Sequence, residues 1–251
     1  NIRPVNKYNN TLPIEIGIAI QNLESFNQIE ETIDINLWFR KSWYDNNLRW
    51  NSSISNITFL SLNIDEVWMP DIELLNAASK PEIYTLKGGL NLYSSGLIMW
   101  SNPAIYSFSC SLELHNFPFD TQKCTMKFSS WIYDNKQIYI KPYNEESKRI
   151  DVLNSFSHSE WEIFNVSYNH YNYTKDCCVG LKYSQIDYIL ELKRFSHYYK
   201  LSMGMTISLV IVSFIIMLIK PDNISRTGTA VFIPLTILAL QLTIADKIPV
   251  V

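Results

Sequence analysis

The segment between Cys110 and Cys124 constrains the fold most, because thirteen residues separate the cysteines and Phe117-Pro118-Phe119-Asp120 lies near the middle. A disulfide between the two cysteines closes a hairpin-like loop and contributes about 3 kcal/mol through the entropy of the unfolded chain. The proline and its aromatic neighbours stiffen the tip. Such an apolar tip packs on another part of the protein or on a membrane surface. The alternative is a disulfide that only staples a β-domain, as in many secreted proteins.

Apolar residues are unevenly distributed along the 251-residue chain. Residues 1–194 mix apolar and polar side chains, whereas residues 201–244 are almost uncharged apart from one short break. This pattern predicts a soluble domain followed by a membrane domain. The formal net charge of -3 and the lack of a basic patch in the sequence give no indication of a nucleic-acid partner.

The sequence offers no catalytic constellation. Four histidines are scattered along it, and it contains no paired carboxylates, nucleophile elbow or metal-ligand spacing. We therefore expect a protein that is not an enzyme and that holds neither a metal nor a cofactor.

Four cysteines, as one spaced pair and the adjacent pair Cys177 and Cys178, suit an oxidising compartment. A disulfide between neighbours closes a strained eight-membered ring, so from the residues alone free thiols or outside partners are preferred. Five Asn-x-Ser/Thr glycosylation triplets fall in the first 194 residues, as an extracellular domain requires; they begin at Asn9, Asn51, Asn56, Asn165 and Asn172. No signal peptide opens the sequence, which indicates a mature or trimmed product.

Alternation of apolar and polar residues dominates the first 194 residues. It is clear over residues 12–50, and period two is the signal of a strand with one buried face. Further short runs, separated by turn-prone clusters, cover 57–62, 89–93, 96–100, 124–133, 137–140, 161–168 and 182–194. About ten short strands with such punctuation predict an antiparallel, immunoglobulin-like β-sandwich.

Two apolar stretches follow the predicted sandwich. Residues 201–219 and 227–244 form uncharged runs of nineteen and eighteen residues. As helices they are about 28 Å and about 27 Å long, enough to cross the hydrocarbon core of a bilayer. We expect transmembrane helices at about 201–219 and 227–245, joined in a hairpin because Lys220-Pro221-Asp222-Asn223 ends the first.

The second apolar stretch carries a repeating face. Its members fall at steps of three or four residues and so share one side of a helix; they are Gly228, Phe232, Leu235, Ala239, Leu242 and Asp246. Taken alone, this face packs on a neighbouring helix. Pro234 lies within the stretch and is expected to kink it.

These features resemble the Cys-loop receptors, the pentameric neurotransmitter-gated ion channels, and in particular the alpha-type subunits of nicotinic acetylcholine receptors. The resemblance rests on the spacing of Cys110 and Cys124 around Phe-Pro-Phe-Asp, with further matches in order along nearly the whole chain. It implies an extracellular ligand-binding sandwich over residues 1–194 and a transmembrane domain over 195–251. The family has two more helices and a cytoplasmic segment, so we expect the sequence to be a truncated record.

The family's ligand pocket lies between subunits and is lined by aromatic rings, which attract an ammonium group. Trp131, in Ser130-Trp131-Ile132-Tyr133-Asp134, matches the central tryptophan of the principal face, and Tyr183 matches a tyrosine of the capping loop. Trp38 matches the tryptophan of the neighbouring subunit, and Met99 is a further candidate on that face. The alternative for any single tryptophan is packing in the core.

The resemblance also implies that both cysteine pairs form disulfides, with Cys177–Cys178 at the tip of the capping loop. Two positions depart from the aromatic pattern, because Leu75 and Lys175 stand where the family has tyrosines. Tyr173 fills the second role if the loop is shifted. Lost rings and the Lys175 ammonium weaken cation binding, so an anionic, zwitterionic or larger amphiphilic ligand stays open beside acetylcholine.

For gating, the resemblance places Phe117, Pro118 and Phe119 against Ile248-Pro249 at the end of the second membrane helix. Arg194 joins the sandwich to the first helix and needs a carboxylate once partly buried. The family's partner position reads Gln28 here, so we expect either that Glu30 or Glu31 serves or that the link is weakened.

In a pentamer the face around Leu235 would line a pore, and the resemblance implies that Leu235 lies at the gate, where a leucine ring can exclude water. Asp246 and Asp222 at the two mouths favour cations, although Ile224-Ser225 matches neither the cation-channel nor the anion-channel pattern, so an anion-selective channel is the alternative. The family has a small residue at the position of Phe232, so a subunit that binds ligand without conducting is a second alternative. A soluble ligand-binding relative is a third. The expected partners are four further subunits, membrane lipid, a small extracellular ligand and permeating ions, at the plasma membrane.

Overall fold

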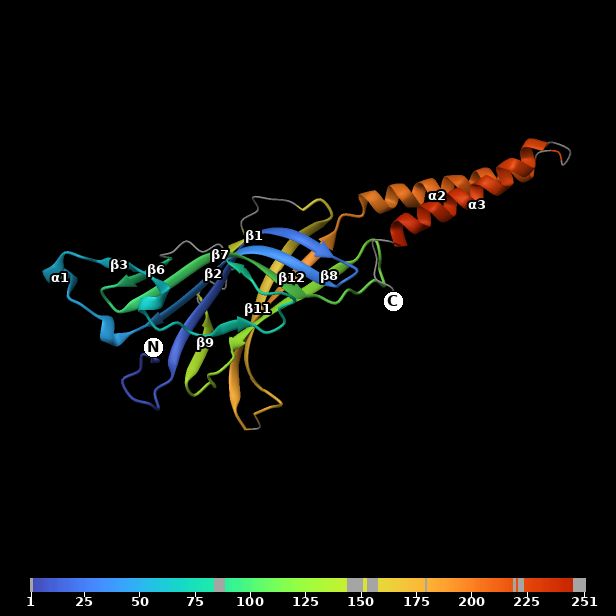
Figure 1. The fold of residues 1–251 in the computed structure, drawn as a ribbon. Helices are drawn as coiled ribbons and strands as arrows, with labels where there is room; N and C mark the ends of the chain where they lie inside the picture. The colour runs from blue at the N-terminus through green and yellow to red at the C-terminus, as the bar shows by residue number, and fades with distance from the viewer. Residues whose placement is uncertain are drawn as a thin grey trace.

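The computed structural model describes residues 2–83, 89–143, 151–152, 158–178, 180–218, 220 and 224–245. Two β-sheets pack face to face, and two antiparallel helices project from one end of this sandwich (Figure 1). The prediction of a mostly β sandwich followed by helices is confirmed.

The larger sheet is built on two long central strands, β2 (Thr32–Tyr44) and β7 (Leu97–Ser109), which pair antiparallel along their whole length. β1 (Leu12–Asn27) lies on the far side of β2, whereas β6 (Leu90–Tyr93) and then β3 (Phe59–Leu62) continue the sheet beyond β7. Its remaining members are β5 (Glu82–Ile83), β9 (Ile138–Pro142) and β10 (Asp151–Val152). β9 and β10 run parallel to β1. The pairing in the sandwich is therefore mostly antiparallel, whereas the sequence predicted only antiparallel pairing.

The smaller sheet has the order β11 (Trp161–Thr174), β12 (Lys182–Arg194), β8 (Thr121–Ser130) and β4 (Ile72–Leu74), all antiparallel. β12 has the predicted bounds. The described residues also form short helical turns at η1 (Asn46–Leu48), α1 (Ser52–Ser55) and η2 (Ile64–Glu66).

The core lies between the two sheets, where the predicted alternation places one face of each strand. Phe39 of β2 stacks on Phe128 of β8 with ring centroids 4.8 Å apart, and Tyr188 of β12 makes a T-shaped contact with Phe128 at 6.0 Å. These rings are buried, and each removes about 150–250 Å² of mostly apolar surface from water. The core therefore fixes β8 and β12, the strands whose ends carry the candidate site.

Two long helices follow β12. α2 (His197–Met217) and α3 (Ile224–Ala245) start slightly before the predicted positions and pack against each other, with Ile216 and Ile233 buried. Within the described residues, the part of α2 from Tyr199 to Ile216 is long and apolar enough to cross a membrane, and Gly228–Leu242 of α3 is a shorter apolar helix. Most other apolar side chains on this hairpin are exposed, as a lipid environment favours.

Candidate functional site

Trp131 lies in the turn that follows β8, and its side chain points out of the sandwich. The Asp71 carboxylate holds this turn by accepting hydrogen bonds from Ser130 Oγ at 2.7 Å and from the Ile132 amide at 2.7 Å. With 68% of its surface exposed, Trp131 has no core-packing role in its own chain. Asp71 was not among the predicted site residues.

The second part of the site is the turn between β11 and β12. Cys177 and Cys178 are bonded to each other, as the resemblance predicts, and the Cys178 amide donates to the Lys175 carbonyl at 3.0 Å. Tyr173 and Tyr183 face each other across the two strands with ring centroids 6.0 Å apart, and Tyr183 is buried. The turn that carries the cysteine pair therefore connects two strands whose facing residues, Tyr173 and Tyr183, are aromatic.

Lys175 bridges the two parts. Its Nζ lies 3.9 Å from the Tyr183 ring centroid and 4.9 Å from the Trp131 ring centroid. It also donates hydrogen bonds to the Ser130 carbonyl at 3.2 Å and to the Trp131 carbonyl at 2.9 Å. Partial burial lowers the pKa of Lys175 from its usual value, and the nearby Asp71 carboxylate opposes that shift. We name Trp131, Tyr173, Lys175 and Tyr183 the aromatic cluster; in it the rings of Trp131 and Tyr183 contact an ammonium supplied by the chain itself.

Three other predicted site residues lie apart from this cluster. Leu75 follows β4 and donates its amide to the Lys127 carbonyl at 2.8 Å. Trp38 and Met99 are half-buried on the outward face of β2 and β7 in the larger sheet. Met99 lines a cavity of about 170 Å³ together with Glu15, Ser42 and Lys141. Within one chain, Trp131 therefore lies at the smaller sheet, whereas Trp38 and Met99 lie on the larger sheet.

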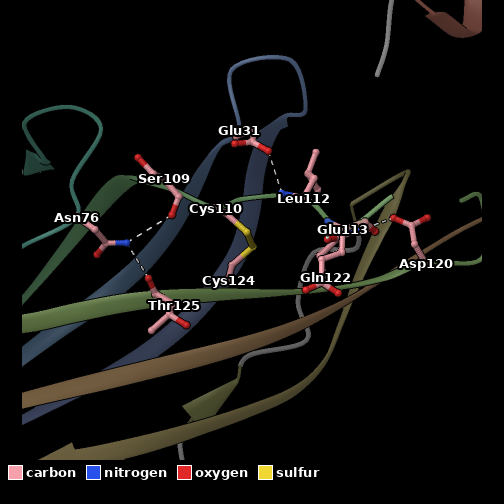
Figure 2. Close-up of a disulfide and its surroundings, with 10 residues drawn as sticks. All are labelled: Glu31, Asn76, Ser109, Cys110, Leu112, Glu113, Asp120, Gln122, Cys124 and Thr125. Carbon is pink, nitrogen blue, oxygen red and sulfur yellow. Dashed lines mark hydrogen bonds between the residues drawn. A yellow bond between two sulfur atoms is a disulfide. The ribbon is translucent and has the colours of Figure 1, made fainter. Parts of the chain in front are cut away.

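The Cys110–Cys124 disulfide is formed and buried, with Cys110 directly after β7 and Cys124 on β8 (Figure 2). It therefore links the two sheets. Glu31 accepts a hydrogen bond from the Leu112 amide at 3.1 Å, and the Gln122 side chain exchanges two hydrogen bonds with the Glu113 backbone (Figure 2). These contacts hold both arms of the loop.

The tip of that loop lies against the start of α2. Phe117 meets the Tyr199 ring edge-on at 4.7 Å between centroids, and the Lys200 Nζ lies 5.2 Å from the Phe119 ring centroid. Phe119 is otherwise exposed. The predicted partners Ile248 and Pro249 lie outside the described residues.

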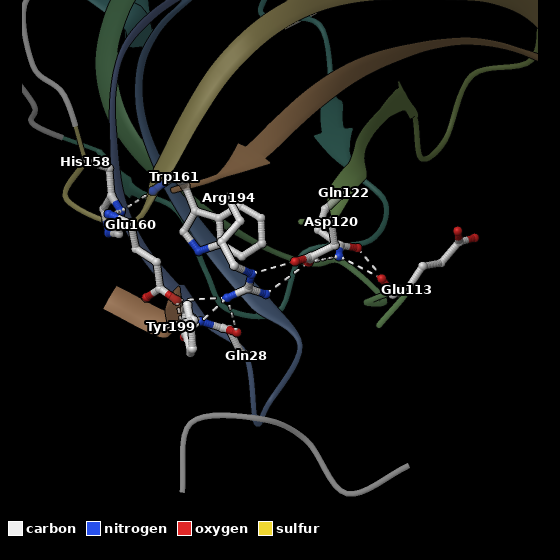
Figure 3. Close-up of polar contacts among 9 residues, drawn as sticks. All are labelled: Gln28, Glu113, Asp120, Gln122, His158, Glu160, Trp161, Arg194 and Tyr199. Atoms are coloured by element: carbon white, nitrogen blue, oxygen red, sulfur yellow. Dashed lines mark hydrogen bonds and ion pairs between the residues drawn. The ribbon is translucent and has the colours of Figure 1, made fainter. Parts of the chain in front are cut away.

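Arg194, the last residue of β12, is buried in the middle of this junction (Figure 3). Its guanidinium forms ion pairs with Asp120 at 2.7 Å and Glu160 at 2.8 Å, and it donates to Gln28 Oε1 at 2.8 Å. The prediction that Glu30 or Glu31 pairs with Arg194 is wrong, because Glu31 instead accepts from the Leu112 amide. Gln28 keeps a direct contact with Arg194, but as a neutral acceptor.

Aromatic rings and a second carboxyl complete what we name the Arg194 junction. The guanidinium carbon lies 4.1 Å from the Trp161 ring centroid and 5.0 Å from that of Phe117. Burial would raise the pKa of Glu160, but hydrogen bonds from Tyr199 and Gln28 and the charge of Arg194 hold it below its usual value. Charged groups from three segments are therefore paired at the point where the sandwich meets α2.

The remaining predicted positions are mostly on the surface of this chain. The five described members of the α3 face are exposed, whereas Asp246 lies outside the described residues; the five are Gly228, Phe232, Leu235, Ala239 and Leu242. The predicted glycosylation sites are also exposed; they are Asn9, Asn51, Asn56, Asn165 and Asn172. Exposure is what either role requires.

Comparison with known proteins gives the family. A model of the neurotransmitter-gated ion-channel ligand binding domain matches residues 1–196. Neuronal acetylcholine receptor subunit alpha-2 of Homo sapiens is 29% identical over 245 residues, which is 96% of this chain and 46% of that protein. Subunit alpha-6 of Homo sapiens is 29% identical over 252 residues, which is 99% of this chain and 50% of that protein. The chain thus spans about half the length of these curated relatives. Since the family model covers most of its length, the chain belongs to the Cys-loop family of neurotransmitter-gated ion channels, a family of receptors rather than enzymes.

Proposed function

We propose that this chain is a subunit of a pentameric ligand-gated ion channel in the plasma membrane. The sandwich, residues 1–194, is extracellular, and α2 and α3 belong to a transmembrane domain that begins at residue 195. A small ligand, an acetylcholine-like amine or another amine or amino acid, binds between subunits. The single observation that carries this proposal is the exposed Trp131 beside the Cys177–Cys178 turn, in a domain of this family.

The two halves of the proposed pocket come from different chains. Trp131 and Tyr183 form the principal half, and Trp38 and Met99 of a neighbouring subunit form the complementary half. The large exposed surface of Trp131 supports this arrangement. An exposed tryptophan contributes strongly to the free energy of binding when a ligand or a neighbouring subunit buries its ring.

The proposed pore is lined by α3. Five copies of the exposed face would place rings of Leu235 side chains around an axis, and such an apolar ring closes a pore by excluding water. Ligand binding would move the sandwich, and the Arg194 junction together with Phe117 would transmit that movement to α2. We propose cation selectivity, with acidic residues at the mouths; an anion-selective channel is the alternative.

Current recording tests this proposal. In cells that express the protein, Leu235→Ser should increase the sensitivity to an activating amine or amino acid, because it makes the proposed gate ring more polar. Ile237→Ser, half a helical turn away and partly buried, is the matched control and should not produce that increase. Exchange of sodium for a large organic cation, and of chloride for a large anion, then identifies the permeating ion.

Phe232 supports a second candidate, a subunit that binds ligand but does not conduct on its own. Its side chain is 68% exposed on the same face as Leu235, where five copies would narrow a pore. Normal surface expression and ligand binding, with no current from the wild type or from Phe232→Ala, would favour this candidate. Current that appears only in Phe232→Ala would show that the phenylalanine ring blocks a working pore.

A further inference from the structure

We propose that the Lys175 ammonium occupies the cation position of the aromatic cluster and so excludes small quaternary ammonium ligands until it is displaced. The proposal rests on the proposed function only for the location of the ligand pocket. It makes Lys175 a specificity-determining residue of that pocket.

The groups that would attract a ligand cation are already engaged by Lys175. Its Nζ lies 3.9 Å from the Tyr183 ring centroid and 4.9 Å from the Trp131 ring centroid, both within the range of a cation–π contact. The carbonyls of Ser130 and Trp131, which also face this position, accept hydrogen bonds from the same nitrogen. An ammonium ligand in the same place would meet a like charge and lose these partners.

The tether makes Lys175 a strong competitor. Its backbone carbonyl accepts from the Cys178 amide at 3.0 Å, so the side chain starts from the base of the disulfide-bonded turn. An occupant that is held on the same chain competes at an effective concentration of the order of millimolar or above. A free amine must therefore displace Lys175 as well as bind, whereas Trp131 remains exposed to whatever a neighbouring subunit supplies.

The test measures the binding of acetylcholine and of tetramethylammonium to the purified protein in detergent by isothermal titration calorimetry. Lys175→Gln and Lys175→Met remove the charge, and Lys175→Met keeps most of the aliphatic stem. Lys182→Gln is the matched control, because Lys182 is exposed and lies opposite Thr174 on the same hairpin. We expect at least about tenfold tighter binding in both Lys175 variants and no change in the control.

Equal affinities for the wild type and both Lys175 variants, or binding by none of them, would overturn the exclusion. Loss of folding in Lys175→Gln does not remove the test, because Lys175→Met is measured in parallel. If the exclusion is overturned, ligand-gated current from the wild type still supports the proposed function. Failure of the exclusion can therefore be distinguished from failure of the proposed function.

A second measurement reports occupancy without any ligand. Reductive methylation of the native protein, followed by mass spectrometry, compares the labelling rates of Lys175 and Lys182. Because a lowered pKa leaves more of the Lys175 amine in its reactive neutral form, each rate is divided by the neutral fraction of that lysine. We expect the corrected rate of Lys175 to be several-fold below that of Lys182, and Trp131→Leu to reduce that difference. Equal corrected rates in the wild type would show that the Lys175 amine is free in solution and would contradict the proposal.

Discussion

The Arg194 junction and the aromatic cluster each place a basic side chain against aromatic rings, yet they differ in what balances the charge. Arg194 is 3% exposed and pairs with two carboxylates, whereas Lys175 donates to two backbone carbonyls beside the exposed Trp131. A buried charge that loses its partner is costly, so the Arg194 contacts are permanent. Lys175 is only partly buried, so a ligand that replaces its contacts can displace it into water. The difference separates a structural junction from the proposed binding site.

The largest expected effect comes from breaking the junction. Asp120→Asn should lower the free energy of unfolding by about 3 kcal/mol, the lower end of the cost of breaking a buried ion pair, because Glu160 still faces the guanidinium. Glu160→Gln should cost about 1 kcal/mol, since the Glu160 side chain is 27% exposed. Chemical denaturation of the detergent-solubilised protein measures both. Equal losses would show that burial does not set the strength of these pairs.

Lys41 sharpens the comparison, because it is buried in the sandwich and donates to the Pro70 and Ile72 carbonyls. Burial lowers its pKa from 10.5 to about 8, against the opposing charges of Glu73 and Asp71. Between these values the unfolded chain binds a proton that the folded protein has lost, so stability rises with pH.

From pH 8 to pH 9.5, the free energy of unfolding should therefore increase by about 1–2 kcal/mol in the wild type relative to Lys41→Met. The interval ends below pH 10 because burial raises the pKa of Tyr188 and of Tyr106, which reverses the slope once tyrosines ionise in the unfolded chain. Denaturant titrations at several pH values give the comparison. Parallel pH profiles for the two proteins would show that Lys41 keeps its proton.

The smallest effect on stability is expected at the aromatic cluster. Trp131→Leu should change the free energy of unfolding by no more than about 0.5 kcal/mol, because the ring is largely exposed in its own chain. The same change should weaken ligand binding by about tenfold or more. Denaturation and calorimetry on one preparation separate the two quantities. A large loss of stability would contradict the view of this cluster as an exchangeable site.

Strand positions followed from the sequence where one face of the strand is buried. β12 has the predicted bounds, and every second residue from Ile186 to Leu192 is a buried apolar one, whereas β7 extends from the predicted end at residue 100 to Ser109. Pro103 argues against a strand interior, because it cannot donate to a ladder. Among the described residues, it lies between the stretch of β7 that pairs with β6 and the stretch that pairs with β5. β11 also continues to Thr174, past the predicted end at 168, since its polar surface residues hide the alternation.

The candidate site was predictable in part. Trp131, Tyr183 and the cysteine pair are spaced as in the family, and the structure brings them together with Lys175. The partners of Arg194 were not predictable, because Asp120 and Glu160 approach it only after three separate segments have packed. Because the family's partner position reads Gln28, the nearby carboxylates Glu30 and Glu31 were expected to serve, but folding turns Glu31 toward the disulfide loop.

The placement of Trp131 and Trp38 on opposite sheets gives every copy of this chain two unlike sides. In the proposed ring, a copy would complete one pocket with its Trp131 side and a different pocket with its Trp38 side. Ligand preference would then depend on which two chains are neighbours and on their order around the ring. A cell that makes a second related chain could therefore change ligand preference by changing the order of the subunits.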